Sequence, residues 1–156
     1  MFCFQCQETA NCTGCTVSGV CGKKPDVAAM QDLLIYATKG LSAVAEKLRE
    51  EGKEVSKEVN HKVTMNLFIT ITNANFDKDA IIKNITETFA LRDSLRKELS
   101  DSTTLPKAAT VAVSPDDYAI FAQSIGVLST ENEDIRSLRE LITYGLKGLA
   151  ALSLIH

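Results

Sequence analysis

The stretch MFCFQCQETANCTGCTVSGVCGKK, residues 1–24, sets the organisation of the whole chain. It contains all the cysteines of the protein, which are Cys3, Cys6, Cys12, Cys15 and Cys21. A cluster of thiols this dense needs a chemical reason, and the candidates are disulfides, a zinc site and an iron–sulfur cluster. We therefore expect a cysteine-rich loop over residues 1–24, with regular structure after it.

Disulfides are the least expected of these three. An odd number of cysteines would leave one thiol unpaired. The N-terminus has neither the basic segment nor the long apolar segment of a secretory signal. We therefore expect the chain to be cytoplasmic, because thiols stay reduced and free in that compartment.

Metal binding suits the cysteine spacing better than disulfides do. Zinc and iron–sulfur clusters both accept deprotonated thiols as ligands. Zinc sites usually use two C-x2-C pairs, whereas this sequence has one such pair. The spacing C-x2-C-x8-C-x5-C suits a four-iron cubane better than a single tetrahedral ion, and it is formed by Cys3, Cys6, Cys15 and Cys21. Zinc stays open as the alternative metal.

The first segment after residue 24 has the pattern of a long amphipathic helix. Pro25 suits a first helical position, and Asp26 suits a first turn. Gly52 is expected to end this helix. Its apolar residues recur every three or four positions, as one buried helix face requires: Val27, Met30, Leu33, Leu34, Ala37, Leu41, Val44 and Leu48.

Two more helices are predicted before residue 100. Ser56 and Asp77 are their N-cap candidates. Residues 67–72 are rich in β-branched side chains, but the spacing of apolar residues by four favours a helix there. The apolar faces are formed by Val59, Val63, Leu67 and Ile71 in one helix and by Ile81, Ile82, Ile85, Phe89, Leu95 and Leu99 in the other. Residues 25–100 are therefore predicted to form an all-α, antiparallel three-helix bundle, with the cysteine loop packed on one end.

The remaining residues are predicted to form a linker over 101–114 and the start of a second helical bundle over 115–156. The apolar residues 108–113 are compatible with an extended conformation. Ser114 and Pro115 predict the start of a short helix that stops near Gly126. Thr130 and Glu133 predict a capping box at the start of the last helix.

The last predicted helix is expected to turn its apolar face inward. Two glycines in it, Gly145 and Gly148, are costly in a helix, so we expect another backbone to approach closely there. The face reaches the last residues without a helix stop, and its burial would contribute about 1.5–3 kcal/mol per side chain. We therefore expect either a partner chain, giving a homo-oligomer, or a longer protein of which this chain is a fragment. The face consists of Ile135, Leu138, Leu141, Ile142, Leu146, Leu149 and Leu152.

Composition gives no reason to expect binding to nucleic acid or to a membrane. There are 17 Lys and Arg residues against 20 Asp and Glu residues, a net charge of −3, which is the wrong sign for nucleic acid. No apolar run approaches the about 20 residues that span a bilayer. His61 is expected to face solvent and His156 to be frayed, because neither has ligand-type neighbours. No catalytic residue is predicted in this chain.

The sequences MFCFQCQETA and TGCTVSGVCGK closely resemble the N-terminus of the hybrid cluster proteins, also called prismane proteins or hydroxylamine reductases. The similarity continues through residues 70–76, 130–141 and 145–148, and so covers nearly the whole chain. It implies an iron–sulfur protein in which a [4Fe–4S] cluster is the cofactor and the metal ligands are Cys3, Cys6, Cys15 and Cys21. Cys12 lies outside the family motif and is expected to be a spare thiol.

The resemblance also implies an oxidoreductase. Members of this family reduce hydroxylamine to ammonia and water at a second, hybrid 4Fe–2S–2O cluster whose ligands lie in later domains. This chain would then be the N-terminal electron-transfer domain, and its partners would be the remaining domains and an electron donor protein. Two alternatives stay open: a non-enzymatic zinc-binding helical module, and a helical fragment that self-associates through its last helix.

Overall fold

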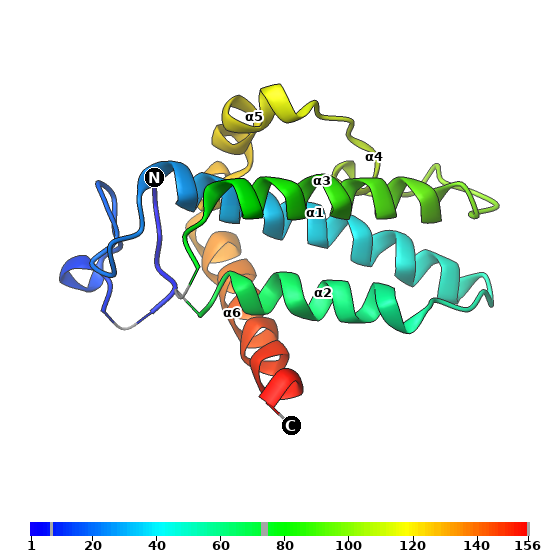
Figure 1. Cartoon of the computed structure of the whole chain (residues 1–156), viewed down its shortest axis with the longest axis horizontal. Helices are drawn as coiled ribbons and strands as arrows, with labels where there is room; N and C mark the ends of the chain where they lie inside the picture. The colour runs from blue at the N-terminus through cyan, green and yellow to red at the C-terminus, as the bar shows by residue number, and fades with distance from the viewer. Residues whose placement is uncertain (7, 73–74, 156) are drawn as a thin grey trace.

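The computed structural model describes residues 1–6, 8–72 and 75–155, which are mainly helical. The long helices of the first part are α1 (Pro25–Glu50), α2 (Lys57–Ile69) and α3 (Lys78–Arg96). They lie alongside one another, with the N-terminal loop at one end of the set (Figure 1). The described residues form no β-strand and contain one isolated bridge, between Cys3 and Cys15. The predicted all-α class is confirmed, and so is a helix over the first part of residues 67–72.

Helix α1 is the centre of the core. Its predicted apolar face is buried along its whole length, from Val27 to Leu48. It packs mainly against α3 and also contacts α2, α4 (Lys107–Thr110) and α5 (Tyr118–Ile125). The largest cluster of buried side chains joins α1, α3 and α5, and consists of Val27, Met30, Leu33, Leu34, Ala37, Ile81, Ile85, Phe89, Tyr118 and Ala122.

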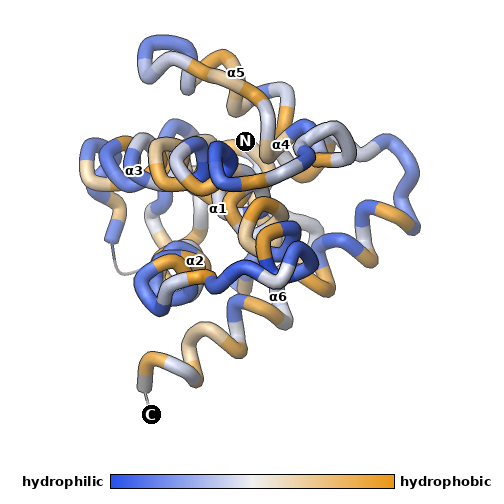
Figure 2. Tube along the Cα trace, turned by 90° about the vertical axis from the view of Figure 1, so that its right-hand side faces the viewer, coloured by the Kyte–Doolittle hydropathy of each residue, from blue (hydrophilic) through white to orange (hydrophobic). Residues whose placement is uncertain are grey.

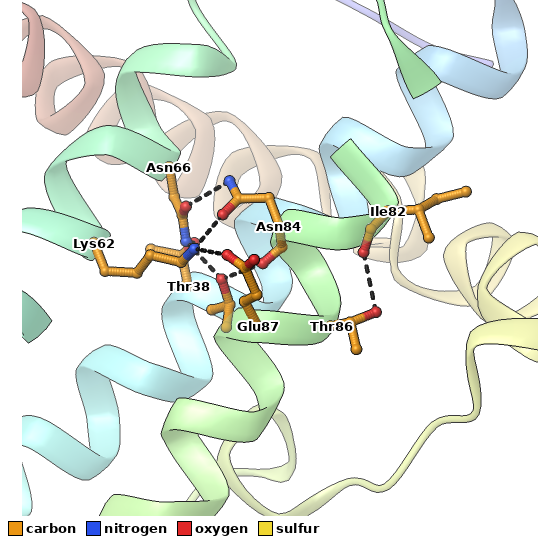
Figure 3. A network of polar contacts seen from close by, with 8 residues as sticks. Thr38, Lys62, Asn66, Ile82, Asn84, Thr86 and Glu87 are labelled. Atoms are coloured by element: carbon orange, nitrogen blue, oxygen red, sulfur yellow. Dashed lines mark hydrogen bonds and ion pairs between the residues drawn. The ribbon is translucent and has the colours of Figure 1, made fainter. Parts of the chain in front are cut away.

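A buried amide joins the first three helices. Asn66 of α2 donates from Nδ2 to Thr38 Oγ1 of α1 and to Thr88 Oγ1 of α3, each at 3.0 Å. Its Oδ1 accepts from Asn84 Nδ2 of α3 at 2.8 Å. Figure 3 shows Thr38, Asn66 and Asn84 turned toward one another. Both polar atoms of the Asn66 side chain are hydrogen-bonded to neighbouring helices. The network therefore fixes the position of α2 against α1 and α3.

The helix ends follow the sequence in most places. Asp77 caps α3, accepting from the backbone N of Asp79 and Ala80. Gly52, with φ +74°, follows α1, and Gly126 follows α5 as expected. Ser56 occupies the N-cap position of α2 but makes no capping hydrogen bond.

The linker differs from the prediction, because the short helix α4 begins at Lys107 and includes residues 108–110 of the apolar stretch 108–113. Only Val111 and the residues after it are extended. Buried Arg92 of α3 donates to Ala108 O at 2.9 Å and to Val111 O at 2.8 Å. At Gly40 of α1, an added Cβ would clash with Ala108 O. Hydrogen bonds from Arg92 therefore hold the linker on the core, and the absence of a side chain at Gly40 allows it to lie close to α1.

The C-terminal part consists of η2 (Pro115–Asp117), α5, η3 (Val127–Ser129) and α6 (Glu133–Ile155). The predicted capping box of Thr130 and Glu133 is wrong. Asn132 Oδ1 accepts from Ile135 N at 3.0 Å and so caps α6 instead. Thr130 lies before α6, and its Oγ1 accepts from Arg139 Nη1 inside the helix at 3.0 Å.

The inward orientation predicted for α6 is also wrong within this chain. Helix α6 packs on α2, and its buried residues are Thr143, Lys147 and Ala150. The residues of the predicted inward face, from Ile135 to Leu152, are 48–68% exposed. Figure 2 shows hydrophobic residues recurring along the trace of α6. Periodicity identifies the residues that share the apolar face, but among the described elements α6 packs mainly on α2, and that contact leaves the face exposed.

The close backbone approach expected at Gly145 and Gly148 is not found among the described residues: outside the adjoining turns of α6, none of their atoms lies within 4 Å of an added Cβ at either position. None of the described helices combines the length and apolar content needed to cross a membrane.

Candidate metal centre

The cysteine loop folds back on itself through its backbone. Cys3 N donates to Cys15 O at 3.0 Å, and Cys15 N donates to Cys3 O at 2.9 Å. Between them lies the single turn η1 (Ala10–Cys12). Gly14 has φ +118°, and an added Cβ would lie 2.6 Å from Phe2 Cε2. Only glycine fits this position without strain, so the return of the chain to Cys3 depends on it.

The sulfur of Cys15 lies at the centre of the loop and is buried. Ala10 N donates to Sγ at 3.5 Å, and Thr9 Oγ1 lies 3.7 Å from it. The backbone N–H groups of Ala10 and Val20, with a smaller effect of Thr9, lower the pKa of the Cys15 thiol below its ordinary value. Donors aimed at sulfur favour the thiolate, which is the form that binds metals.

Cys3 has a different environment. Burial raises the pKa of its thiol, and the nearby positive charge of Lys23 acts in the opposite direction. Lys23 Nζ lies 3.9 Å from Cys3 Sγ. Lys23 was not predicted as a site residue, although it directly follows Cys21 and Gly22 in the sequence.

The other cysteines lie around this pair. Cys6 is half-buried, and its O accepts from Thr9 N at 3.3 Å. Cys21 is exposed, and its Sγ would lie 3.0 Å from a Cβ added to Gly19. Cys12 is exposed. The five thiols are free, and among residues 1–6, 8–72 and 75–155 no three Cys, His, Asp or Glu side chains gather as a metal-ligand group. The structure thus pairs Cys3 with Cys15 and holds Cys6 and Cys21 in the same loop.

A buried polar cluster lies behind the loop and was not predicted. Lys147 of α6 is fully buried and donates to Gln5 Oε1. Burial raises the pKa of Asp32 to about 7, against the opposing charge of Lys147. Burial lowers the pKa of Lys147 itself to about 8. Gln31 Nε2 is buried there and has no hydrogen-bond partner among residues 1–6, 8–72 and 75–155. This cluster connects α6 to the cysteine loop through Lys147 and Gln5. The sequence contained one indication of it: Thr143, Lys147 and Ala150 are spaced by three or four residues, as one buried side of a helix requires.

Of the two histidines, the structure describes only His61. His61 is exposed, as predicted, beside a hollow of about 630 Å³ between α2 and α3. His156 lies outside the described residues.

Comparison with known protein families matches residues 1–155 to the Prismane/CO dehydrogenase family. The chain belongs to this family, as the resemblance predicted. Its relatives include a hydroxylamine reductase of Clostridium perfringens, 54% identical over 158 residues, and one of Desulfovibrio desulfuricans, 51% identical over 152 residues. Each alignment covers 97% of this chain but only 29% and 28% of the relative. The chain therefore spans less than a third of the length of these relatives.

Proposed function

We propose that this chain is the N-terminal electron-transfer part of a hydroxylamine reductase, and that it holds a [4Fe–4S] cluster on Cys3, Cys6, Cys15 and Cys21. The observation that supports this most directly is the environment of the Cys15 sulfur, which receives backbone N–H groups at the centre of a loop carrying all the cysteines. Membership of the family and relatives named hydroxylamine reductase support the activity of the whole protein.

The chemistry of the donor set fits such a cluster. Four thiolates are the usual ligands of a four-iron cubane, one for each corner. The backbone pairing of Cys3 with Cys15 would fix two of them, and Cys6 and Cys21 would complete the set from the same loop. Hydrogen bonds to cluster-bound sulfur stabilise negative charge and raise the reduction potential. Cys12 has no role in this proposal.

The bound cluster would accept and pass on single electrons. The residues of this chain would hold it: Ala10, Val20 and Thr9 direct donors at Cys15, and Lys23 directs a cation at Cys3. Reduction of hydroxylamine to ammonia and water consumes two electrons and two protons. We assign that step to a hybrid 4Fe–2S–2O cluster in the part of the protein that this chain does not span. The donor of the electrons would be another cytoplasmic protein, and the remaining domains would cover the exposed face of α6.

The test is anaerobic reconstitution of the purified chain with iron and sulfide. We expect about four iron and four sulfide ions per chain, a brown colour, and a paramagnetic signal after reduction with dithionite. Cys15→Ser should lose most of the bound iron, because it removes the buried ligand whose sulfur accepts a backbone N–H. Cys12→Ser is the matched control and should bind as much iron as the unmodified chain.

Two outcomes would contradict the proposal. A colourless protein that binds one zinc ion and no sulfide would favour the zinc-binding module instead. Equal loss of iron in Cys12→Ser and Cys15→Ser would show that the assigned ligand set is incorrect.

A further inference from the structure

Lys23 is buried in a way that lysine rarely is. Only 1% of its surface is exposed, although lysine is almost never fully buried without a partner of opposite charge. Among the described residues, none of the ion pairs includes Lys23. Its Nζ instead lies 3.9 Å from Cys3 Sγ and 5.9 Å from the centre of the Phe76 ring. Within the part of the chain that the structure describes, the hydrogen-bond contact of this buried cation is therefore with a thiol.

The backbone holds Lys23 in this position. Gly19 N donates to Lys23 O at 2.8 Å, closing the turn that carries Cys21. A Cβ added to Gly19 would lie 3.0 Å from Lys23 Cβ, so the lysine stem is packed against the turn. Helix α1 begins two residues later. Lys23 is thus fixed between the cysteine loop and the first helix.

Other charged groups face the same region. Asp32 and Lys147 belong to the polar cluster behind the loop. Of the charged groups that act on Cys3, Lys23 acts most strongly, and Asp32 opposes it with a weaker effect. The net field at Cys3 is therefore set first by Lys23.

We propose that Lys23 is a positioning residue that raises the reduction potential of the cluster by holding a fixed positive charge against the Cys3 sulfur. This inference rests on the proposed function. One electron enters the cluster from the reductant, no bond is broken, and the negative charge of the cluster with its four thiolates increases by one. A cation next to a ligand sulfur stabilises the more negative, reduced state more than the oxidised state.

The experiment compares the cluster-loaded chain with three variants in a potentiometric titration followed by electron paramagnetic resonance. Lys23→Met removes the charge and keeps the apolar stem. We expect it to lower the equilibrium constant for one-electron reduction at least about tenfold, which is a downward shift of 59 mV. Lys23→Arg keeps the charge and should restore most of the potential. Lys24→Met removes the same charge from the exposed neighbouring position and should change the constant by less than about twofold.

A second measurement separates this role from a structural one. Lys23 makes no ion pair with a described residue, and Asp32 acts on it only as a more distant charge. Burying a cation in this way costs free energy, so without the cluster Lys23→Met should melt at the same temperature as the unmodified chain or higher. A purely structural lysine predicts a lower melting temperature and an unchanged potential, and that result would overturn the inference. If Lys23→Met binds no iron, Lys23→Arg decides: restored iron content supports the charge, and an equally empty protein contradicts it.

The proposed function fails separately. If the unmodified chain binds no iron and sulfide, the cluster assignment is wrong, and the effect of Lys23 on a reduction potential does not arise. If it binds four irons and Lys23→Met has the same potential, the cluster assignment stands and only the inference about Lys23 is wrong.

Discussion

Helices α1 and α6 have similar lengths, 26 and 23 residues, and both carry an apolar residue at every third or fourth position. In α1 that face is buried against α2, α3, α4 and α5. In α6 the corresponding face is exposed, and the helix is attached to α2 through its polar and small side chains. The difference teaches that periodicity shows which residues share a face but not whether another surface covers that face.

The polar contacts of α6 fix its orientation. A fully buried lysine needs an acceptor, and Lys147 finds one in Gln5 of the cysteine loop. Contacts of this kind specify one orientation, because an apolar face can slide while a buried cation cannot leave its acceptor without cost. The apolar core of α1 supplies stability, and the polar contacts of α6 supply position.

The largest expected effect comes from shortening one leucine in each helix. Leu34 of α1 is 0% exposed and Leu149 of α6 is 61% exposed. Leu34→Ala should lower the free energy of unfolding by about 3–5 kcal/mol, because it leaves a cavity in the core. Leu149→Ala should change it by less than about 0.5 kcal/mol. Urea denaturation of the two variants measures both values. A large loss in Leu149→Ala would mean that the α6 face is covered in solution.

The sequence could predict features that depend on near neighbours in the chain. The buried face of α1, the cap at Asp77 and the helix stop at Gly126 each follow from residues within a few positions of one another. The grouping of the cysteines into one loop is equally local, and so is the family motif.

The features that the sequence could not predict join distant positions. Arg92 bonds to the backbone 16 and 19 residues away, and Lys147 bonds to Gln5 across 142 residues. Nothing in the local pattern marks which carbonyl or amide a long side chain will reach. The burial of Lys23 could not be predicted for a related reason, because it depends on how the loop, the first helix and Phe76 come together. The capping box at Thr130 failed because Asn132 competes for the same helix start.

A buried polar contact inside the α1 core should be nearly as sensitive as an apolar one. The hydroxyl of Thr38 donates to Leu34 O, and that of Thr88 donates to Asn84 O. Both hydroxyls can therefore only accept from Asn66. Asn66→Asp would place a carboxylate against two acceptors and should lower the free energy of unfolding by about 2–3 kcal/mol at pH 7. The loss should shrink in acid, because protonation removes the buried charge.

The same substitution at the surface of α2 is the control. Asn60 is exposed, and its Oδ1 accepts from Arg49 Nη2 at 2.7 Å. Asn60→Asp keeps that acceptor and adds a charge of the right sign, so its effect should be within about 0.5 kcal/mol. Equal losses in the two variants would show that the amide network does not distinguish the core from the surface.

The smallest effect, but the one with opposite signs in the two helices, comes from adding a methyl group to a glycine. Gly40 of α1 lies against Ala108 O, whereas an added Cβ at Gly148 of α6 meets no atom of the described residues within 4 Å outside its own helix turns. Gly40→Ala should lower the free energy of unfolding by about 1–2 kcal/mol, because α4 must move away from α1. Gly148→Ala should raise it by about 0.5–1 kcal/mol, since alanine loses less backbone entropy in a helix. Thermal melting of the pair measures the difference. Should Gly148→Ala be destabilising instead, a backbone from outside the described chain must lie against α6, and its exposed face would then be an interface rather than a free surface.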